Sequence, residues 1–182
     1  MPKTERQKYI LKHEYDSFIE NCPKKYKLFW AIVAFGGLRI SEALLISAND
    51  VLYLENKILI HTLKRKGRPI IPVIFSEKII NEVKEYTISK SINNKIWPFS
   101  RQYAFKLFKS ICIKAGLDSH YSPHCLRHFA GVMIAEITNG NMIEIKNRLR
   151  HSNIRSTEFY VHVSEKKQKE LANKIEEYMK GV

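Results

Sequence analysis

The densest concentration of reactive side chains lies in the segment His120–His128, which holds three histidines, a cysteine and an arginine. Ser122-Pro123 is a typical helix start, so His124 and Arg127 would share one face of the first helical turn. The unpaired N–H groups of that turn, an imidazole and a guanidinium can together bind an anion such as a phosphate. The spacing therefore predicts an anion site.

Two other interpretations of this segment stay open. His124 and His128, at i and i+4, could ligate a metal together with Cys125 or His120. The segment lacks the acidic residue of the H-E-x-x-H motif and Cys125 lies on a different helix face, so we expect no metal. The His-x-x-Arg pair could also be ordinary helix surface, because two polar residues three apart often occur by chance.

A second candidate is Arg39, which follows the glycine turn Gly36-Gly37 at the start of a short helix. Apolar neighbours would hold Arg39 near the core, where an arginine needs an anion. Glu42, at i+3, could be that anion in an ordinary ion pair. Alternatively, Glu42 orients the guanidinium while the remaining donors face a phosphate.

A third stretch, Leu149–Val163, reads Leu-Arg-His-Ser-Asn-Ile followed by Thr-x-x-Tyr-x-His-Val. Gly-Leu-Arg-Ile-Ser-Glu, a basic hairpin and His-x-x-Arg precede it in the chain. In this order the motifs resemble those of the tyrosine recombinase (phage integrase) family, from Tyr9 to about Val163. Each motif is weak alone, but the ordered set, with tyrosine nine residues after histidine, is specific.

The resemblance implies roles for five residues. Arg39 and Arg127 would clamp the scissile phosphate, and His124 and His151 would hydrogen-bond it or move protons. Tyr160 would be the nucleophile, although a tyrosine on an apolar helix is more often core packing. This set suits a phosphodiester, because a phenol can attack phosphorus while two arginines stabilise the charge of the transition state.

The leaving 5′-oxygen needs a proton, which family members usually take from a lysine on the sheet hairpin. Counting back from Pro72, the family spacing selects Lys64 as this general acid, with Lys66 as the alternative. The cluster could also be a solvated basic turn that only touches DNA phosphates. DNA contacts are expected from the other basic residues of the hairpin and from the turn before His151: Arg65, Lys66, Arg68 and Arg150.

The elements that position these residues are mostly helical. Apolar spacing, caps and breaks predict helices over about 13–21, 24–35, 39–46, 100–115, 122–138, 141–149 and 153–163. A further helix begins at Ser76 and carries its apolar stripe as far as Tyr86. Three strand-like pieces lie at Val51–Leu54, Lys57–Thr62 and Pro69–Val73. The expected fold class is α+β, mostly α-helical, with a small three-stranded antiparallel sheet, as in the tyrosine recombinase catalytic fold.

Composition narrows the function classes. The 182 residues are 45% hydrophobic, which fits a single folded domain, and their net charge of +13 indicates a polyanion such as nucleic acid. The longest apolar run, Leu28–Leu38, is too short to span a membrane, and no secretory signal is visible. Three cysteines without a C-x-x-C pair argue against a disulfide framework and a zinc ribbon. We therefore expect a cytoplasmic protein.

The ends of the chain depart from the family pattern. Residues 1–12 would form a basic arm, which leaves no room for the N-terminal core-binding domain of most relatives. The chain would then be a catalytic-domain fragment or a minimal recombinase. Residues 164–182 would form a helix that packs on its own domain or docks in trans on a neighbouring subunit. Position 150 is arginine where glycine is usual before the histidine.

The resemblance implies a site-specific recombinase that cuts and rejoins double-stranded DNA through a covalent 3′-phosphotyrosyl link. It implies no metal or nucleotide cofactor, and four protomers in the synaptic complex from a chain that is monomeric in solution. A type IB topoisomerase would use the same chemistry without exchanging partners. A non-catalytic DNA-binding regulator would keep the fold alone. The abundance of lysine, isoleucine and asparagine hints at an AT-rich mobile element.

Overall fold

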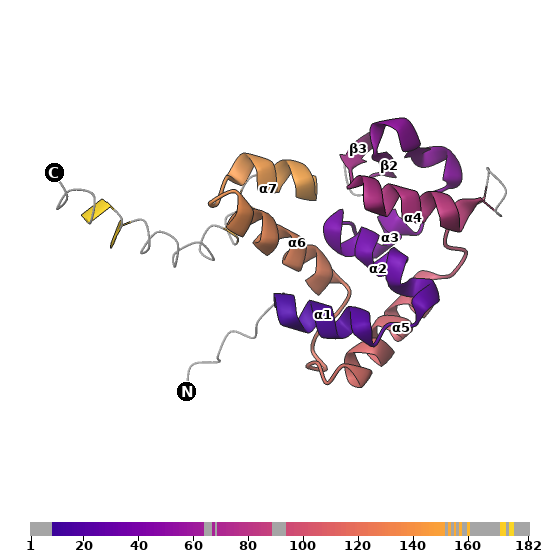
Figure 1. The fold of residues 1–182 in the computed structure, drawn as a ribbon, viewed down its shortest axis with the longest axis horizontal. Helices are drawn as coiled ribbons and strands as arrows, with labels where there is room; N and C mark the ends of the chain where they lie inside the picture. The colour runs from indigo at the N-terminus through magenta and orange to yellow at the C-terminus, as the bar shows by residue number, and fades with distance from the viewer. Residues whose placement is uncertain are drawn as a thin grey trace. The chain divides into compact units, whose positions relative to one another are not determined.

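The protein is described from a computed structural model, which covers residues 9–63, 67, 69–88, 94–151, 153, 155, 157, 160, 172, 173, 175 and 176. The chain divides into two compact units, Met1–Ala130 and Gly131–Val182, and each is described by itself. The boundary falls inside α6 (His124–Ile137). Figure 1 labels the elements in chain order.

The first unit begins with two helices separated by Pro23. These are α1 (Lys12–Glu20) and α2 (Lys24–Phe35), which confirm the helices expected over 13–21 and 24–35. Their buried faces meet in aromatic contacts: the ring of Phe18 lies 5.8 Å from that of Trp30 and 5.0 Å from that of Phe108 on α5 (Arg101–Lys114). This aromatic cluster forms part of the core that supports the elements carrying the candidate site.

A short helix and three strands follow. The helix expected over 39–46 is only α3 (Ile40–Ala43), because the N–H groups of Leu45 and Ile46 donate to carbonyls three residues back instead of four. The carbonyl of Ile46 then accepts a hydrogen bond from the N–H of Ile96. After the 3-10 turn η1 (Ala48–Asp50) come β1 (Val51–Leu52), η2 (Tyr53–Glu55), β2 (Lys57–His61) and β3 (Ile70–Ile74). β1 is shorter than expected because η2 replaces its second half.

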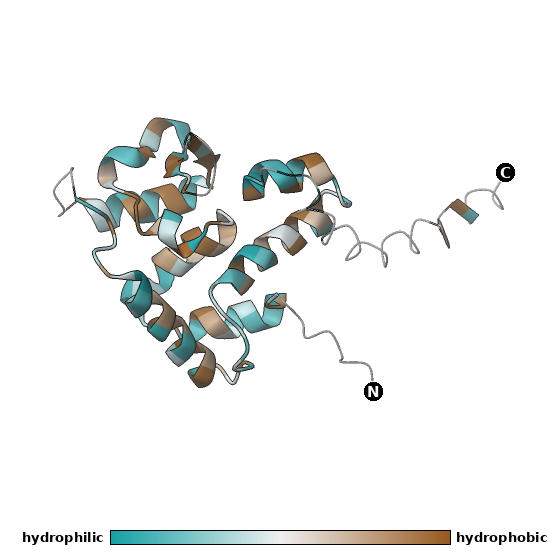
Figure 2. Ribbon diagram, turned by 180° about the vertical axis from the view of Figure 1, so that it is seen from behind, coloured by the Kyte–Doolittle hydropathy of each residue, from teal (hydrophilic) through white to brown (hydrophobic). Residues whose placement is uncertain are grey.

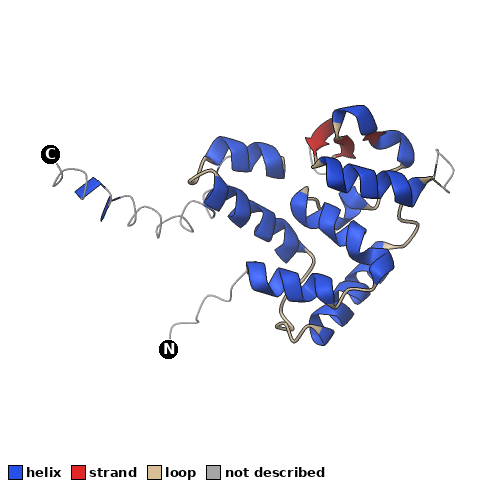
Figure 3. Cartoon of the chain, in the orientation of Figure 1, coloured by secondary structure: helices blue, strands red, loops and turns tan. Residues whose placement is uncertain are grey.

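The strands form the predicted antiparallel sheet, in the order β1-β2-β3. Figure 3 draws the strands in red. Lys57 pairs with Ile74 and His61 with Ile70, so β2 and β3 run as a full hairpin. Alternation along β2 buries Ile58 and Ile60. The sheet therefore turns one face of β2 to the core and carries the hairpin loop at its end.

Two longer helices complete the first unit. Ser76 caps α4 (Glu77–Thr87) and Ser100 caps α5 (Arg101–Lys114), each by accepting a hydrogen bond from a backbone N–H three residues on. Polar and apolar segments alternate along the helices, as amphipathic packing requires (Figure 2). None of the helices in the described part of the chain combines the length and the apolarity that a membrane crossing requires.

The second unit contains the end of α6 and α7 (Met142–Leu149). Asn139 and Gly140 both have positive φ angles at the break between the two helices. The Asn141 side chain caps α7 by accepting hydrogen bonds from two backbone N–H groups. Beyond α7, positions 155, 157 and 160 are helical, where a helix over 153–163 was expected.

The described elements confirm the expected fold class, a mostly helical chain with one small antiparallel sheet. The predictions for residues 1–8, and those for most of the segment after Val163, fall outside the described residues.

Candidate active site

Glu42 joins the two arginines predicted to bind a phosphate. Its side chain is fully buried, its Oε1 accepts a hydrogen bond from Arg39 Nη1 at 2.6 Å, and its Oε2 lies 3.9 Å from Arg127 Nη1. The N–H of Arg39 also donates to Oε2, at 2.9 Å. These three side chains carry two positive charges and one negative charge, so an anion bound beside them would be favoured.

The backbone turn after α2 holds Arg127 in place. Arg127 is only 2% exposed, and its Nη1 donates a hydrogen bond to the carbonyl oxygen of Gly37 at 2.7 Å. Gly37 has a φ of 56°, which glycine adopts without strain. A Cβ on Gly36 would lie 2.7 Å from Phe75 Cζ, so this position has no room for a side chain. The predicted glycine cap is confirmed, and it anchors an arginine 90 residues later in the chain.

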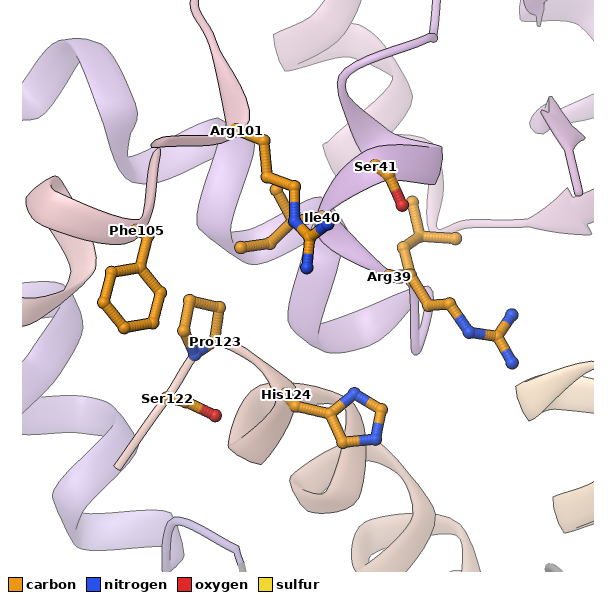
Figure 4. A pocket seen from close by; sticks show the side chains of 9 residues that line it. Arg39, Ile40, Ser41, Arg101, Phe105, Ser122, Pro123 and His124 are labelled. Atoms are coloured by element: carbon orange, nitrogen blue, oxygen red, sulfur yellow. The ribbon is translucent and has the colours of Figure 1, made fainter. Parts of the chain in front are cut away.

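A cavity of about 370 Å³ opens beside Arg39 and His124. Arg101 and Phe105, from the first turns of α5, line the same cavity (Figure 4). No motif in the sequence marked these two residues. The only signal was the Ser100 cap, which places a basic and an aromatic side chain one helical turn apart at the start of a helix. A guanidinium and an exposed aromatic ring at one opening suit a nucleotide.

The segment that leads into His124 is fastened at two points. Lys109 on α5 donates hydrogen bonds to the carbonyl oxygens of Ser119 and Tyr121, both at 2.6 Å. The Tyr121 hydroxyl donates to the Glu14 carboxylate on α1, and burial together with this carboxylate raises the pKa of Tyr121. These hydrogen bonds hold the segment before His124 in place. His124 is the first residue of α6, and its side chain is exposed.

The residues of the alternative metal site have other partners. The rings of His124 and His128 are 4.7 Å apart, but His120 Nδ1 lies 2.8 Å from an Asp118 oxygen. Burial raises the pKa of the Cys125 thiol, which accepts a hydrogen bond from the N–H of Ser122. Within the described ranges, no three His, Cys, Asp or Glu side chains form a group that could hold a metal ion.

The second unit brings His151 and Tyr160 together. Their ring centroids are 6.3 Å apart with the planes 22° from parallel, and His151 Nδ1 lies 3.2 Å from Thr157 Oγ1. Tyr160 is 1% exposed and Thr157 is fully buried. The predicted nucleophile is therefore shielded from solvent here.

Arg150, expected to contact DNA, ends α7 with a φ of 54°. This left-handed conformation is the physical reason why a glycine suits the position. The residue is 3% exposed and its Nη1 donates to the carbonyl oxygen of Arg148.

The basic hairpin lies mostly outside the described residues, which include none of Lys64, Arg65, Lys66 and Arg68. Its base is defined, because both the N–H and the hydroxyl of Thr62 donate to the carbonyl oxygen of Pro69. At the adjoining end of β2, His61 Nε2 lies 2.8 Å from a carboxylate oxygen of Asp50. The tip residue Gly67 has a φ of 79°. These contacts fix the base of the hairpin.

The family model described as "Phage integrase family" matches residues 8–167. The chain is 26% identical to tyrosine recombinase XerD of Staphylococcus haemolyticus (strain JCSC1435) over 150 residues, covering 76% of this chain and 50% of that protein. The chain spans about half the length of the curated relatives that it matches.

Two solved structures share the fold. One is the XerH site-specific recombinase bound to a palindromic difH substrate in a post-cleavage complex, with a TM-score of 0.75, 24% identity and coverage of 91% of this chain and 52% of that one. The other is the catalytic domain of bacteriophage HP1 integrase, with a TM-score of 0.67, 22% identity and coverage of 86% and 88%. These likenesses confirm the expected catalytic-domain fold.

Proposed function

Because the chain belongs to the phage integrase family, we propose that it cuts and rejoins DNA strands as a site-specific recombinase, through a covalent 3′-phosphotyrosyl intermediate. The observation that carries this proposal is the arrangement of Arg39 and Arg127 around the buried carboxylate of Glu42. Two guanidiniums held on one fixed carboxylate are preorganised for a phosphate, which is what stabilises a phosphoryl-transfer transition state.

The proposed reaction has two steps, cleavage and rejoining. The Tyr160 oxygen attacks phosphorus, its proton passes to a histidine of the site (His124 or His151), and the bond from phosphorus to the 5′-oxygen breaks. Lys64 gives the leaving oxygen its proton. A 5′-hydroxyl later attacks the phosphotyrosine and releases Tyr160. The phosphotyrosine keeps the bond energy, so this scheme requires neither a nucleotide nor a metal.

Double-stranded DNA is the proposed partner. The net charge of +13 supports this, as do the DNA complexes of XerH and of the Tn1549 transposon integrase. We further propose a single catalytic domain that acts in the cytoplasm of its cell or host, with four copies assembled on two duplexes.

The experiment that tests the mechanism is covalent capture. The protein is incubated with a library of nicked duplexes of randomised sequence, and adducts that survive denaturant are isolated and sequenced, which removes the need to know the target site. We expect an adduct with the wild-type protein and with Tyr26→Phe, a matched loss of a hydroxyl elsewhere, and none with Tyr160→Phe. An adduct that persists in Tyr160→Phe contradicts the mechanism.

The captured sequence then separates the other functions. A recombinase exchanges strands between two marked duplexes that carry it, whereas a type IB topoisomerase relaxes a supercoiled plasmid without exchange. A regulator binds DNA and forms no adduct with any member of the library.

The general acid can be assigned with a modified substrate. Lys64→Ala should slow cleavage by about 10²–10⁴-fold, because the 5′-oxygen leaves without a proton. Replacing that oxygen by sulfur should restore the rate, since a thiolate leaves without protonation. Lys66→Ala serves as the matched control and should respond little to sulfur; the reverse pattern assigns the role to Lys66.

A further inference from the structure

Gly131 lies in the interior of α6 and is buried. Glycine inside a helix is less favourable than alanine, because the backbone loses more freedom on folding and gains no side-chain packing. The chain continues as a helix for six residues beyond Gly131, so this glycine neither caps nor ends α6. A glycine at such a position calls for a packing reason.

The space left by the missing side chain is filled by the ring of Tyr160. A Cβ built on Gly131 would lie 2.5 Å from Cζ and 2.9 Å from Cδ1 of Tyr160, and closer still to Cε1. Even a single methyl group would therefore displace the ring. Two of these atoms, Cζ and Cε1, belong to the end of the ring that carries the hydroxyl. Gly131 therefore positions the end of the Tyr160 ring that carries the hydroxyl, rather than the end that is attached to Cβ.

The same placement keeps Tyr160 out of solvent. Tyr160 is 1% exposed, and the ring of His151 lies nearly parallel to it at 6.3 Å. A phenol oxygen that attacks a phosphate in DNA must contact that phosphate. The ring must therefore leave Gly131, or move along α6, before the oxygen can react.

We propose that Gly131 is a positioning residue for Tyr160: its missing side chain forms a seat on α6 that holds the ring buried and withholds the hydroxyl until the ring moves. This proposal rests on the proposed role of Tyr160 as the nucleophile. The seat itself is a property of the packing of the second unit and can be tested without DNA.

The first test is a thermal double-mutant cycle on the full chain. With tyrosine at position 160, Gly131→Ala should lower Tm, because the methyl group and the ring compete for one space. In the Tyr160→Ala background the same change should raise Tm by about 2–4 °C, since only the gain in helix propensity remains. If Gly131→Ala shifts Tm in the same direction in both backgrounds, the proposal that Gly131 seats the Tyr160 ring is wrong.

The second test keeps the proposal decidable if Tyr160→Ala does not fold. Wild type and Gly131→Ala are treated with N-acetylimidazole, and acetylation of Tyr160 is followed by mass spectrometry. We expect at least a fivefold faster modification of Tyr160 in Gly131→Ala and none of this increase in Ile137→Ala, which places alanine on the exposed side of the same helix. An unchanged rate overturns the seat.

The functional readout is single-turnover adduct formation on a captured substrate. Gly131→Ala should form the adduct several-fold faster at saturating DNA with an unchanged dissociation constant, a split that a merely structural role would not produce. A slower or unchanged rate overturns the withholding role. If the wild-type protein forms no adduct with any substrate, the proposed function fails, while the thermal cycle still decides whether the seat exists.

Discussion

A buried carboxylate between two arginines is the central residue-scale feature of the protein. The ion pair expected between Glu42 and Arg39 is present at 2.6 Å, and the second oxygen of Glu42 accepts a hydrogen bond from the backbone N–H of Arg39. Arg127 approaches the same carboxylate and has its own carbonyl partner. The observed ion pair and the proposed phosphate clamp therefore share one carboxylate.

Glu42→Gln should test this double role. The amide keeps the shape of the side chain but removes the charge, so two guanidiniums face each other without a buried anion. We expect a loss on the order of 3 kcal/mol in the free energy of unfolding, measured by urea denaturation. Glu77→Gln, at an exposed position on α4, should change it by less than about 0.5 kcal/mol. Equal losses in the two variants would contradict the role assigned to Glu42.

Arg101 should contact a DNA phosphate, because it lines the cavity beside Arg39 and His124. In Arg101→Gln, the slope of log Kobs against log salt concentration should become shallower by about 0.9, the value for one lost phosphate contact. The measurement uses a mixed-sequence duplex and needs no target site. Lys114→Gln, at the other end of α5, is the control for simple loss of charge. An identical change in slope for both variants would leave Arg101 without a specific role.

At the scale of elements, the limits that are set by nearby residues in the sequence could be predicted. Pro23 and Gly36-Gly37 bound α2 on either side, so its limits were predicted correctly. The sheet followed from alternation and turn residues. The shortened α3 was not predictable, because its hydrogen bonds tighten to three-residue spacing after Leu44 where no residue type marks a break.

The same distinction applies to the candidate site. Arg39, Glu42 and Arg127 stand in motifs and could be found from the sequence. Arg101 and Phe105 could not, because the packing of α5 against α3 decides that they line the same cavity as Arg39. The likewise unmarked Gly131 matters only through Tyr160, 29 residues later. Motifs identify the groups that react, while tertiary packing selects the groups that surround them.

The turn after α2 supports an element-scale prediction. Gly37→Ala forces a Cβ into a left-handed conformation and should cost about 1–2 kcal/mol in the free energy of unfolding. It should also shift the carbonyl that holds Arg127 and so slow adduct formation. Gly116→Ala is the matched control: Gly116 has a φ of 67° with open space around it, so it should lose similar stability and keep its cleavage rate. Equal cleavage by both variants would contradict an anchoring role for Gly37.

At the scale of the whole molecule, the charge of +13 lies on a chain of only 21.4 kDa. Such a charge opposes self-association of the free protein, and DNA neutralises it. Multi-angle light scattering at about 0.15 M salt should therefore give the mass of one chain without DNA. Complexes with two bound duplexes should contain four chains. A stable tetramer without DNA would contradict this assembly.

The three cysteines of the chain are free and buried. Burial raises the pKa of Cys22 to about 11 and that of Cys112 to about 12, and it raises the pKa of Cys125 as well. Thiolates, which are the reactive form, are therefore scarce at neutral pH, and the three residues are at most 6% exposed. A single cysteine introduced at an exposed position such as Ile137 could then carry a fluorophore with the native thiols left in place. The protein is thus suited to single-molecule tests of the proposed strand exchange without a cysteine-free background.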